Sequence, residues 1–109
     1  MEVKTIEDMV YDFDWISNGW ASRTSKAPTK EYQGKVIAVC NALKYNGFTP
    51  RSMQCTHSGL IQCKYTSKFG RTLYITPVFD RYGEFLVSAH NLTVRPVKTV
   101  SDIIEILKG

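Results

Sequence analysis

The sequence has little of what stabilises a small protein from outside its hydrophobic core. Its three cysteines cannot all pair with one another, so no disulfide scaffold is indicated and a reducing compartment is expected. No apolar run approaches the roughly 20 residues that a membrane helix needs. The first ten residues, MEVKTIEDMV, hold acids and lack the apolar segment of a signal peptide. We therefore expect a cytoplasmic protein with no membrane partner.

Sequence features of catalysis are equally scarce. The glycines in the middle of the chain fall between predicted strands, as hairpin glycines do, and they form no phosphate-binding loop. Asp80 and Glu84 flank one of these turns and do not form an acid–base pair. Cys40 lies in the apolar stripe of a predicted helix, and nothing around Cys55 or Cys63 would activate a thiolate nucleophile. We expect no enzymatic activity and no cofactor.

The composition is that of one globular domain whose charge is unevenly distributed. A chain of 109 residues, 43% hydrophobic and 22% charged, can bury a single core without help from metal or disulfides. The net charge of +4 conceals an acidic start and a basic middle, because residues 1–20 hold five acids and one base, whereas residues 21–98 hold twelve bases and three acids. Such a local field attracts negatively charged partners, although the same charge could serve solubility alone.

The N-terminal third of the chain is predicted to hold a helix and a loop. Thr5 followed by Asp8 is a variant of the capping box, and apolar residues at helical spacing extend from it. We expect this first helix over residues 6–17. Residues 21–30 contain three bases, no acid and no periodicity, so they are predicted to be a basic loop.

Two further helices are predicted from their caps and apolar faces. The second begins after Thr29 and ends at Tyr45, where Asn46 and Gly47 supply a left-handed cap. The third begins after Thr99. The expected buried residues are Tyr32, Val36, Val39, Cys40 and Leu43 in the second helix, and Val100, Ile103, Ile104 and Leu107 in the third.

Residues 51–90 alternate polar and apolar positions and are cut by glycine turns. Four predicted strands read RSMQCTH, LIQCKYT, RTLYITPVF and EFLVSAH, which indicates an antiparallel meander. Pro77 requires an edge or a bulge in the third strand, and residues 92–94 could add a short fifth strand. The predicted fold is one α+β domain over residues 1–109: a four-stranded antiparallel β-meander with two N-terminal helices and one C-terminal helix packed on the sheet.

This order of elements resembles those of double-stranded-RNA-binding domains and SH2 domains, but the signature residues of both families are absent. The last predicted helix begins near Asp102, where an RNA-binding domain of that kind would carry lysines. No predicted strand has the FLVR-like arginine of an SH2 domain. The chain is therefore assigned to neither family on its sequence.

Cys55, His57, Cys63 and His90 are candidate metal ligands, because sulfur and imidazole nitrogen are what tetrahedral zinc prefers. A three-residue turn at residues 58–60 would set Cys55 opposite Cys63, with His57 on the same side. However, Cys-x-His is not the spacing of a compact zinc site, and small buried cysteines are common in strands. We expect no metal, and the sequence leaves open whether the four residues meet in space.

The remaining candidate is a binding surface in which cations lie next to aromatic rings. Such a surface suits phosphate contacts combined with base stacking. Phe69 is expected to be exposed, because a turn tip has little core to enter, whereas aromatics within strands often serve packing alone. Arg23, Lys26, Lys30 and Arg51 could extend the surface. The predicted nucleic-acid-binding residues are Lys64, Lys68, Phe69, Arg71, Arg81 and Tyr82.

Two hypotheses for function follow from these features. The leading hypothesis is a small non-enzymatic binding protein whose basic, aromatic surface binds a polyanion, with nucleic acid as the first choice. The alternative is a small accessory or inhibitor protein of the phage type, which binds and blocks another protein. Trp15 and Trp20 behind the acidic first helix could anchor such a partner, or they could simply close the core. The sequence does not indicate the oligomeric state.

Overall fold

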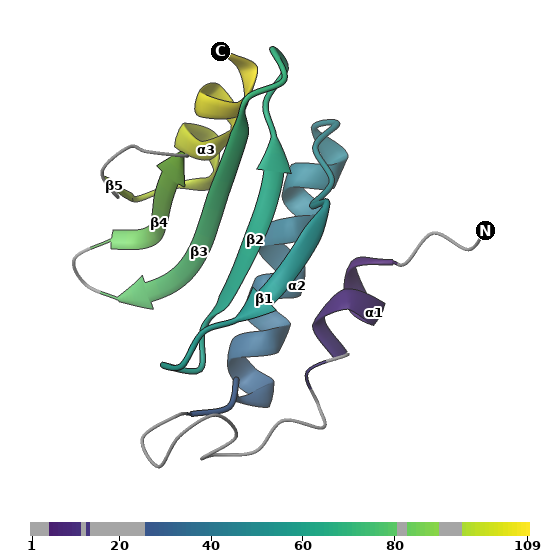
Figure 1. Cartoon of the computed structure of the whole chain (residues 1–109), viewed down its shortest axis with the longest axis vertical. Helices are drawn as coiled ribbons and strands as arrows, with labels where there is room; N and C mark the ends of the chain where they lie inside the picture. The colour runs from purple at the N-terminus through teal and green to yellow at the C-terminus, as the bar shows by residue number, and fades with distance from the viewer. Residues whose placement is uncertain (1–4, 12, 14–25, 81–82, 90–94) are drawn as a thin grey trace.

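A computed structural model describes residues 5–11, 13, 26–80, 83–89 and 95–109 of the chain. The elements in chain order are α1 (Ile6–Tyr11), α2 (Lys30–Tyr45), β1 (Ser52–Cys55), β2 (Ile61–Thr66), β3 (Thr72–Asp80), β4 (Gly83–Ala89), β5 (Arg95–Val97) and α3 (Val100–Lys108). The strands pair in the order β1-β2-β3-β4-β5, and each pairing is antiparallel (Figure 1). The predicted α+β meander is confirmed, with β5 as its fifth strand.

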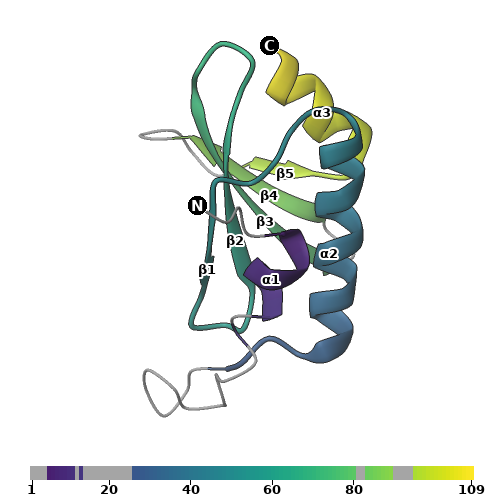
Figure 2. The same ribbon diagram turned by 90° about the vertical axis from the view of Figure 1, so that its right-hand side faces the viewer.

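The helices lie on one side of the sheet, with α2 and α3 crossing that face and α1 packed against α2 beside β1 (Figure 2). Successive side chains of a strand point to opposite faces of the sheet, so the strands contribute alternate residues to the core. In β2 every second side chain is buried. The opposite face carries no helix among the described residues and is open to solvent. The buried apolar residues are Ile6, Val10, Val36, Cys40, Leu43, Ile61, Cys63, Tyr65, Leu73, Ile75, Phe85, Val87, Val97, Ile103 and Leu107.

The start of α1 confirms the predicted capping box. The Asp8 N–H donates to Thr5 Oγ1 at 3.1 Å, and the Thr5 N–H donates to Asp8 Oδ2 at 3.4 Å. The first bond satisfies one of the amides that have no partner inside the helix, and the second holds the cap residue itself.

The end of α1 comes earlier than predicted. The Phe13 N–H donates to the Val10 carbonyl at 3.1 Å, an i to i+3 bond that closes a turn, and the helix ends at Tyr11. The predicted continuation through residues 14–17 lies outside the described residues, and so do Trp15 and Trp20.

Both ends of α2 lie where the sequence predicts them. Thr29 Oγ1 accepts the Tyr32 N–H at 3.1 Å and caps the first turn. At the other end the Phe48 N–H donates to the Leu43 carbonyl at 2.9 Å, across Gly47 with its left-handed φ of 93°. This bond is the 6→1 hydrogen bond of a Schellman motif. Together with the Gly47 N–H, which donates to the Lys44 carbonyl at 2.9 Å, this bond satisfies two of the carbonyls left open at the end of the helix.

The buried face of α2 differs from the prediction in part. Gln33 is buried, while Tyr32 and Val39 are only partly buried. The polar Gln33 side chain is accommodated because its Nε2 donates to the Pro28 carbonyl at 3.1 Å, just ahead of the helix. Apolar periodicity alone cannot predict a buried amide of this kind. The remaining predicted core positions of α2 are confirmed: Val36, Cys40 and Leu43.

At the C-terminal end of the chain the predicted cap of α3 is confirmed, whereas the fifth strand lies at other residues than predicted. Thr99 Oγ1 accepts the Asp102 N–H at 3.1 Å and caps α3 as predicted. The fifth strand is Arg95–Val97, whereas the predicted residues 92–94 lie outside the described residues. Pro96 is tolerated in this strand because β5 is an edge, where a missing N–H on the solvent side breaks no ladder.

Strand β3 carries the predicted irregularity at Pro77. The β3–β4 register shifts between Pro77 and Asp80, and Phe79 between them has a left-handed φ of 58°. A non-glycine residue pays about 1 kcal/mol or more for this conformation. The Phe79 ring is held edge-on between Tyr32 and Phe85, with both centroid distances at 5.8 Å. Aromatic packing thus compensates for the backbone strain of the bulge.

The Tyr32 hydroxyl bridges β2 and β3 where their ladder ends. The register that pairs Cys63 with Ile75 would place Ile61 opposite Pro77 two residues further on. Because proline has no N–H, that pair cannot exchange two hydrogen bonds. Instead Tyr32 Oη accepts the Ile61 N–H at 2.9 Å and donates to the Pro77 carbonyl. Burial raises the pKa of Tyr32 above its ordinary value, so the bridging proton is retained at neutral pH.

A second tyrosine hydroxyl provides a matched control for this bridge. Tyr65 Oη is buried and has no hydrogen-bond partner within the described part of the chain. We expect Tyr32→Phe to lower the free energy of unfolding by about 1–3 kcal/mol, because it removes the acceptor of a buried amide. Tyr65→Phe should leave stability unchanged or raise it by up to about 1 kcal/mol.

Urea denaturation followed by circular dichroism measures both variants. Equal losses for the two substitutions would show that the Tyr32 bridge contributes nothing beyond ordinary packing.

Candidate nucleic-acid interface

The face of the sheet opposite the helices is mainly polar over β1, β2 and the start of β3, whereas Leu86 and Pro96 add apolar side chains to it at β4 and β5. Lys64 of β2 lies on this face, between Ser52 of β1 and Tyr74 of β3, and Tyr74 in turn pairs with Ser88 of β4. Neighbouring positions of β1 and β2 on the same face are Gln54, Gln62 and Thr66. Amides, hydroxyls and the Lys64 cation therefore line this part of the surface, and Lys64 is the one predicted binding residue within it among those that the structure describes.

The β2–β3 connection is a three-residue loop closed by Ser67. The Ser67 N–H donates to the Arg71 carbonyl at 2.8 Å, and the Arg71 N–H donates back to Ser67 Oγ at 3.0 Å. The Gly70 N–H donates to the Ser67 carbonyl at 2.9 Å, and Gly70 has a left-handed φ of 84°. A turn followed by a left-handed glycine is the standard three-residue hairpin. It leaves Lys68 and Phe69 at the tip.

This tip is fixed to the C-terminal end of α3. The Lys68 N–H donates to the Leu107 carbonyl at 2.7 Å, which satisfies one of the four carbonyls left open at the end of the helix. Phe69 lies beside Gly109 and remains 77% exposed, as the sequence predicts. The Lys68 ammonium lies 5.9 Å from the centroid of the Phe69 ring, within the range of a cation–π contact. The tip therefore presents a ring and a cation from an anchored backbone.

Further cations gather at the same end of the molecule. The C-terminal ends of α2 and α3 and the β2–β3 connection all lie at one end of the sheet in both views (Figures 1 and 2). Arg51 joins this group, because its N–H donates to the Lys64 carbonyl at 2.7 Å. We call this surface the basic end; its residues are Lys44, Tyr45, Arg51, Lys64, Lys68, Phe69, Arg71 and Lys108.

The basic end faces little opposing charge. Of the six cations of the basic end, Lys64 is partly buried and the other five are exposed. Glu105 is the only acid in the described segments that form this end, which are residues 43–51, 64–72 and 105–109. The other acids with described side chains lie in α1 and at the starts of α2, β4 and α3. Lys44 and Lys108 were not predicted from the sequence, because a lysine in the last turn of a helix is already explained by the helix dipole. Tyr45 was not predicted either. The signal for Tyr45 is an aromatic residue outside the apolar stripe of its helix.

The other predicted cations do not belong to this surface. Lys26 pairs with Ser58 in the β1–β2 connection, and Lys30 begins α2, so both lie at the far end of β2. Arg81 and Tyr82 lie outside the described residues. The end of β3 and the start of β4 flank these two residues. The full length of the nine-residue β3, roughly 30 Å along the strand, separates these strand ends from the hairpin tip.

The predicted pairing of Cys55 with Cys63 is wrong. Cys55 lies opposite Ile61, and Met53 lies opposite Cys63. The cause is the position of the turn, because Thr56 closes the β1–β2 loop around residues 57–59 instead of 58–60.

This β1–β2 loop repeats the hydrogen bonds of the β2–β3 tip. The Thr56 N–H donates to the Leu60 carbonyl at 2.8 Å, the Leu60 N–H donates to Thr56 Oγ1 at 3.2 Å, and the Gly59 N–H donates to the Thr56 carbonyl at 3.1 Å. Gly59 has a left-handed φ of 80°. The shared pattern is Ser or Thr, two residues, Gly and one residue, and it predicts the register of both hairpins.

The cysteine and histidine side chains do not form a site among the described residues. Cys63 is buried against Cys40, and the Cys40 thiol together with burial raises the pKa of Cys63 well above its ordinary value. A thiol with a raised pKa is a weak nucleophile at neutral pH. His57 is exposed, while His90 lies outside the described residues. Within the described ranges, no three His, Cys, Asp or Glu side chains come close enough together to hold a metal ion.

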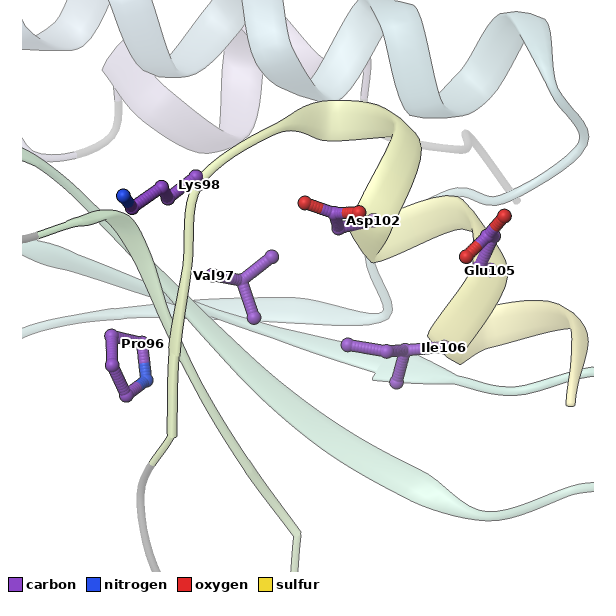
Figure 3. A pocket seen from close by; sticks show the side chains of 6 residues that line it. All are labelled: Pro96, Val97, Lys98, Asp102, Glu105 and Ile106. Carbon is purple, nitrogen blue, oxygen red and sulfur yellow. The ribbon is translucent and has the colours of Figure 1, made fainter.

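A groove of about 510 Å³ lies between β5 and α3 (Figure 3). Val97 and Ile106 approach each other along it, and Asp102 lies beside them (Figure 3). Its charged residues carry both signs, so it offers no uniform field to a polyanion. The lining residues are Pro96, Val97, Lys98, Asp102, Glu105 and Ile106.

Comparison of the chain with protein-family models, with curated proteins and with solved structures gave no match. None of the helices formed by the described residues has the length and apolar character to cross a membrane.

Two glycines in equivalent loop positions test how the tip is built. A Cβ at Gly70 would meet no atom within 4 Å, whereas a Cβ at Gly59 would come within 3.0 Å of the Ala27 carbonyl oxygen. We expect Gly70→Ala to cost about 1–2 kcal/mol of stability for the left-handed backbone alone. Gly59→Ala should cost at least about 1 kcal/mol more, because overpacking adds to the strain.

Urea denaturation of both variants measures the difference. Equal costs would show that the segment around Ala27 yields without penalty, and a neutral Gly70→Ala would contradict the strained loop.

Proposed function

We propose that the chain is a non-enzymatic binding protein whose basic end contacts a polyanion, with nucleic acid as the partner. The observation that supports this proposal is that six cations from five separate segments lie at one end of the sheet, while the described segments that form this end contain one acid, Glu105. Cations that serve solubility alone have no reason to converge in this way, since dispersed charge serves that purpose as well.

The physical basis of binding is the release of counterions from phosphates. Each lysine or arginine that neutralises a phosphate frees condensed ions, which makes the affinity steeply dependent on salt. The open sheet face beside the cations adds neutral donors, because side-chain amides and hydroxyls also contact phosphate oxygens. Gln54, Gln62 and Thr66 are such groups, and all lie on the face that carries Lys64. The basic end and the sheet face together suit a charged backbone better than a small anion.

The protein-binding alternative has its candidate anchors, Trp15 and Trp20, outside the described residues. It is therefore an outcome of the binding experiment.

Substitution of Lys64, Lys68 and Arg71 together by alanine tests the proposal. We expect affinity for a fluorescein-labelled oligonucleotide, measured by anisotropy, to fall at least about tenfold. The slope of log K against log salt should fall by about two, because each lost contact with a single strand removes about 0.7. Lys30→Ala is the matched control at the far end of β2, and it should leave both quantities unchanged.

Circular dichroism verifies that the variants are folded. Absence of binding by the unsubstituted protein at low salt would overturn the proposal and favour a protein partner. An effect of Lys30→Ala on log K as large as one third of that of the triple variant would show that each lost charge counts equally, so that net charge, and not the basic end, is responsible. Arg81→Ala is a further arm that asks whether the surface includes the β3–β4 connection.

A further inference from the structure

Phosphate contacts account for the cations of the basic end but not for its aromatic rings. The described residues include four large exposed apolar side chains: Tyr45 at 93%, Phe69 at 77%, Tyr11 at 53% and Leu86 at 37%. The two most exposed rings both belong to the basic end. An exposed ring gains little from a phosphate, whereas it gains from any flat surface that can cover it.

Both rings are held on fixed backbone. Phe69 occupies the hairpin tip that Lys68 fixes to the Leu107 carbonyl at 2.7 Å. Tyr45 is the last residue of α2, directly before the Schellman motif that ends at Phe48. A ring on an ordered segment loses little conformational freedom on binding, so more of the contact energy remains as affinity. Two flexible loops would not have this advantage.

Cations accompany both rings. The Lys68 ammonium is 5.9 Å from the Phe69 centroid, whereas Lys44 is the neighbour of Tyr45 along α2 and its side chain leaves the helix in a different direction. Alternation of rings and cations is the arrangement that follows a strand of nucleotides, since each nucleotide offers a flat base and a charged phosphate. In a duplex the bases are already stacked and paired, so they cannot cover a ring on the protein surface.

We propose that the basic end binds single-stranded nucleic acid, with unpaired bases stacked on Phe69 and Tyr45 and phosphates at the neighbouring cations. This inference rests on the proposed polyanion function and names its substrate class. Lys68 and Arg71 contact the backbone beside Phe69, and Lys44 contacts it beside Tyr45. Stacking tolerates any base, so binding shows little sequence preference.

Anisotropy with a labelled oligothymidylate of about 15 nucleotides and with a labelled duplex of the same length tests the inference. The single strand should bind at least about tenfold more tightly than the duplex. Phe69→Ala and Tyr45→Ala should each weaken single-strand binding at least about fivefold and leave the salt slope unchanged, because stacking releases no counterions. Tyr45→Phe keeps the ring and should keep the affinity.

Tyr11→Ala is the matched control, because it removes an exposed ring from α1, which carries acids in its first turn. Circular dichroism checks that each variant is folded. Equal affinity for single strand and duplex, with Phe69→Ala and Tyr45→Ala at parental affinity, would overturn the inference while the polyanion function stands. Absence of binding to both probes would overturn the polyanion function itself, and this inference with it.

Discussion

The pairing of β2 with the bulged end of β3 depends on one partly buried hydroxyl, that of Tyr32. Beyond Ile75 the third strand can no longer pair directly with β2, because Pro77 lacks an amide hydrogen and Phe79 turns the backbone into a left-handed conformation. The Tyr32 hydroxyl accepts from Ile61 and donates to Pro77, so it replaces the missing rung with a side chain from α2. One residue thus joins the helix layer to two strands, and the bulged end of β3 stays against the core instead of separating from it.

Both hairpins next to β2 are closed by backbone and hydroxyl groups, and in the β2–β3 hairpin the tip side chains take no part in closing the turn. In each loop a Ser or Thr hydroxyl and a left-handed glycine satisfy the turn. Phe69 and Lys68 therefore contribute little to the stability of the fold, and their exposure has to be explained by something other than packing. At the β1–β2 loop the backbone of the equivalent positions pairs with the segment before α2, where the Lys26 N–H donates to the His57 carbonyl at 2.9 Å. The same turn serves the fold at one end of β2 and presents side chains at the other.

Signals that act within a few residues could be predicted from the sequence, whereas signals that depend on distant partners could not. The caps at Thr5, Thr29 and Thr99 were predictable because hydroxyl and amide lie three residues apart. Strand alternation gave the buried face of β2, since the period of two is local. The turn between β1 and β2 lies at residues 57–59 and not at residues 58–60, the turn considered from the sequence. This difference keeps each side chain on its face of the sheet but changes its partner on the neighbouring strand. The burial of Gln33, the hydroxyl bridge of Tyr32 and the placement of the end of α2 and the hairpin tip at the same end of the sheet all depend on the tertiary fold.

Folding also divides the basic middle of the sequence into separate surfaces. The +9 of residues 21–98 suggests one strong field, but Lys26 and Lys30 lie roughly 20 Å from the hairpin tip, the length of β2. At physiological salt an exposed charge is screened within about 8 Å, so cations at the two ends do not reinforce each other. Among the described cations, those near the ends of α2, α3 and β2 share one end of the sheet and are the group that can reinforce one local field. The case for a polyanion partner therefore rests on this local convergence, and the total charge of the chain adds little to it.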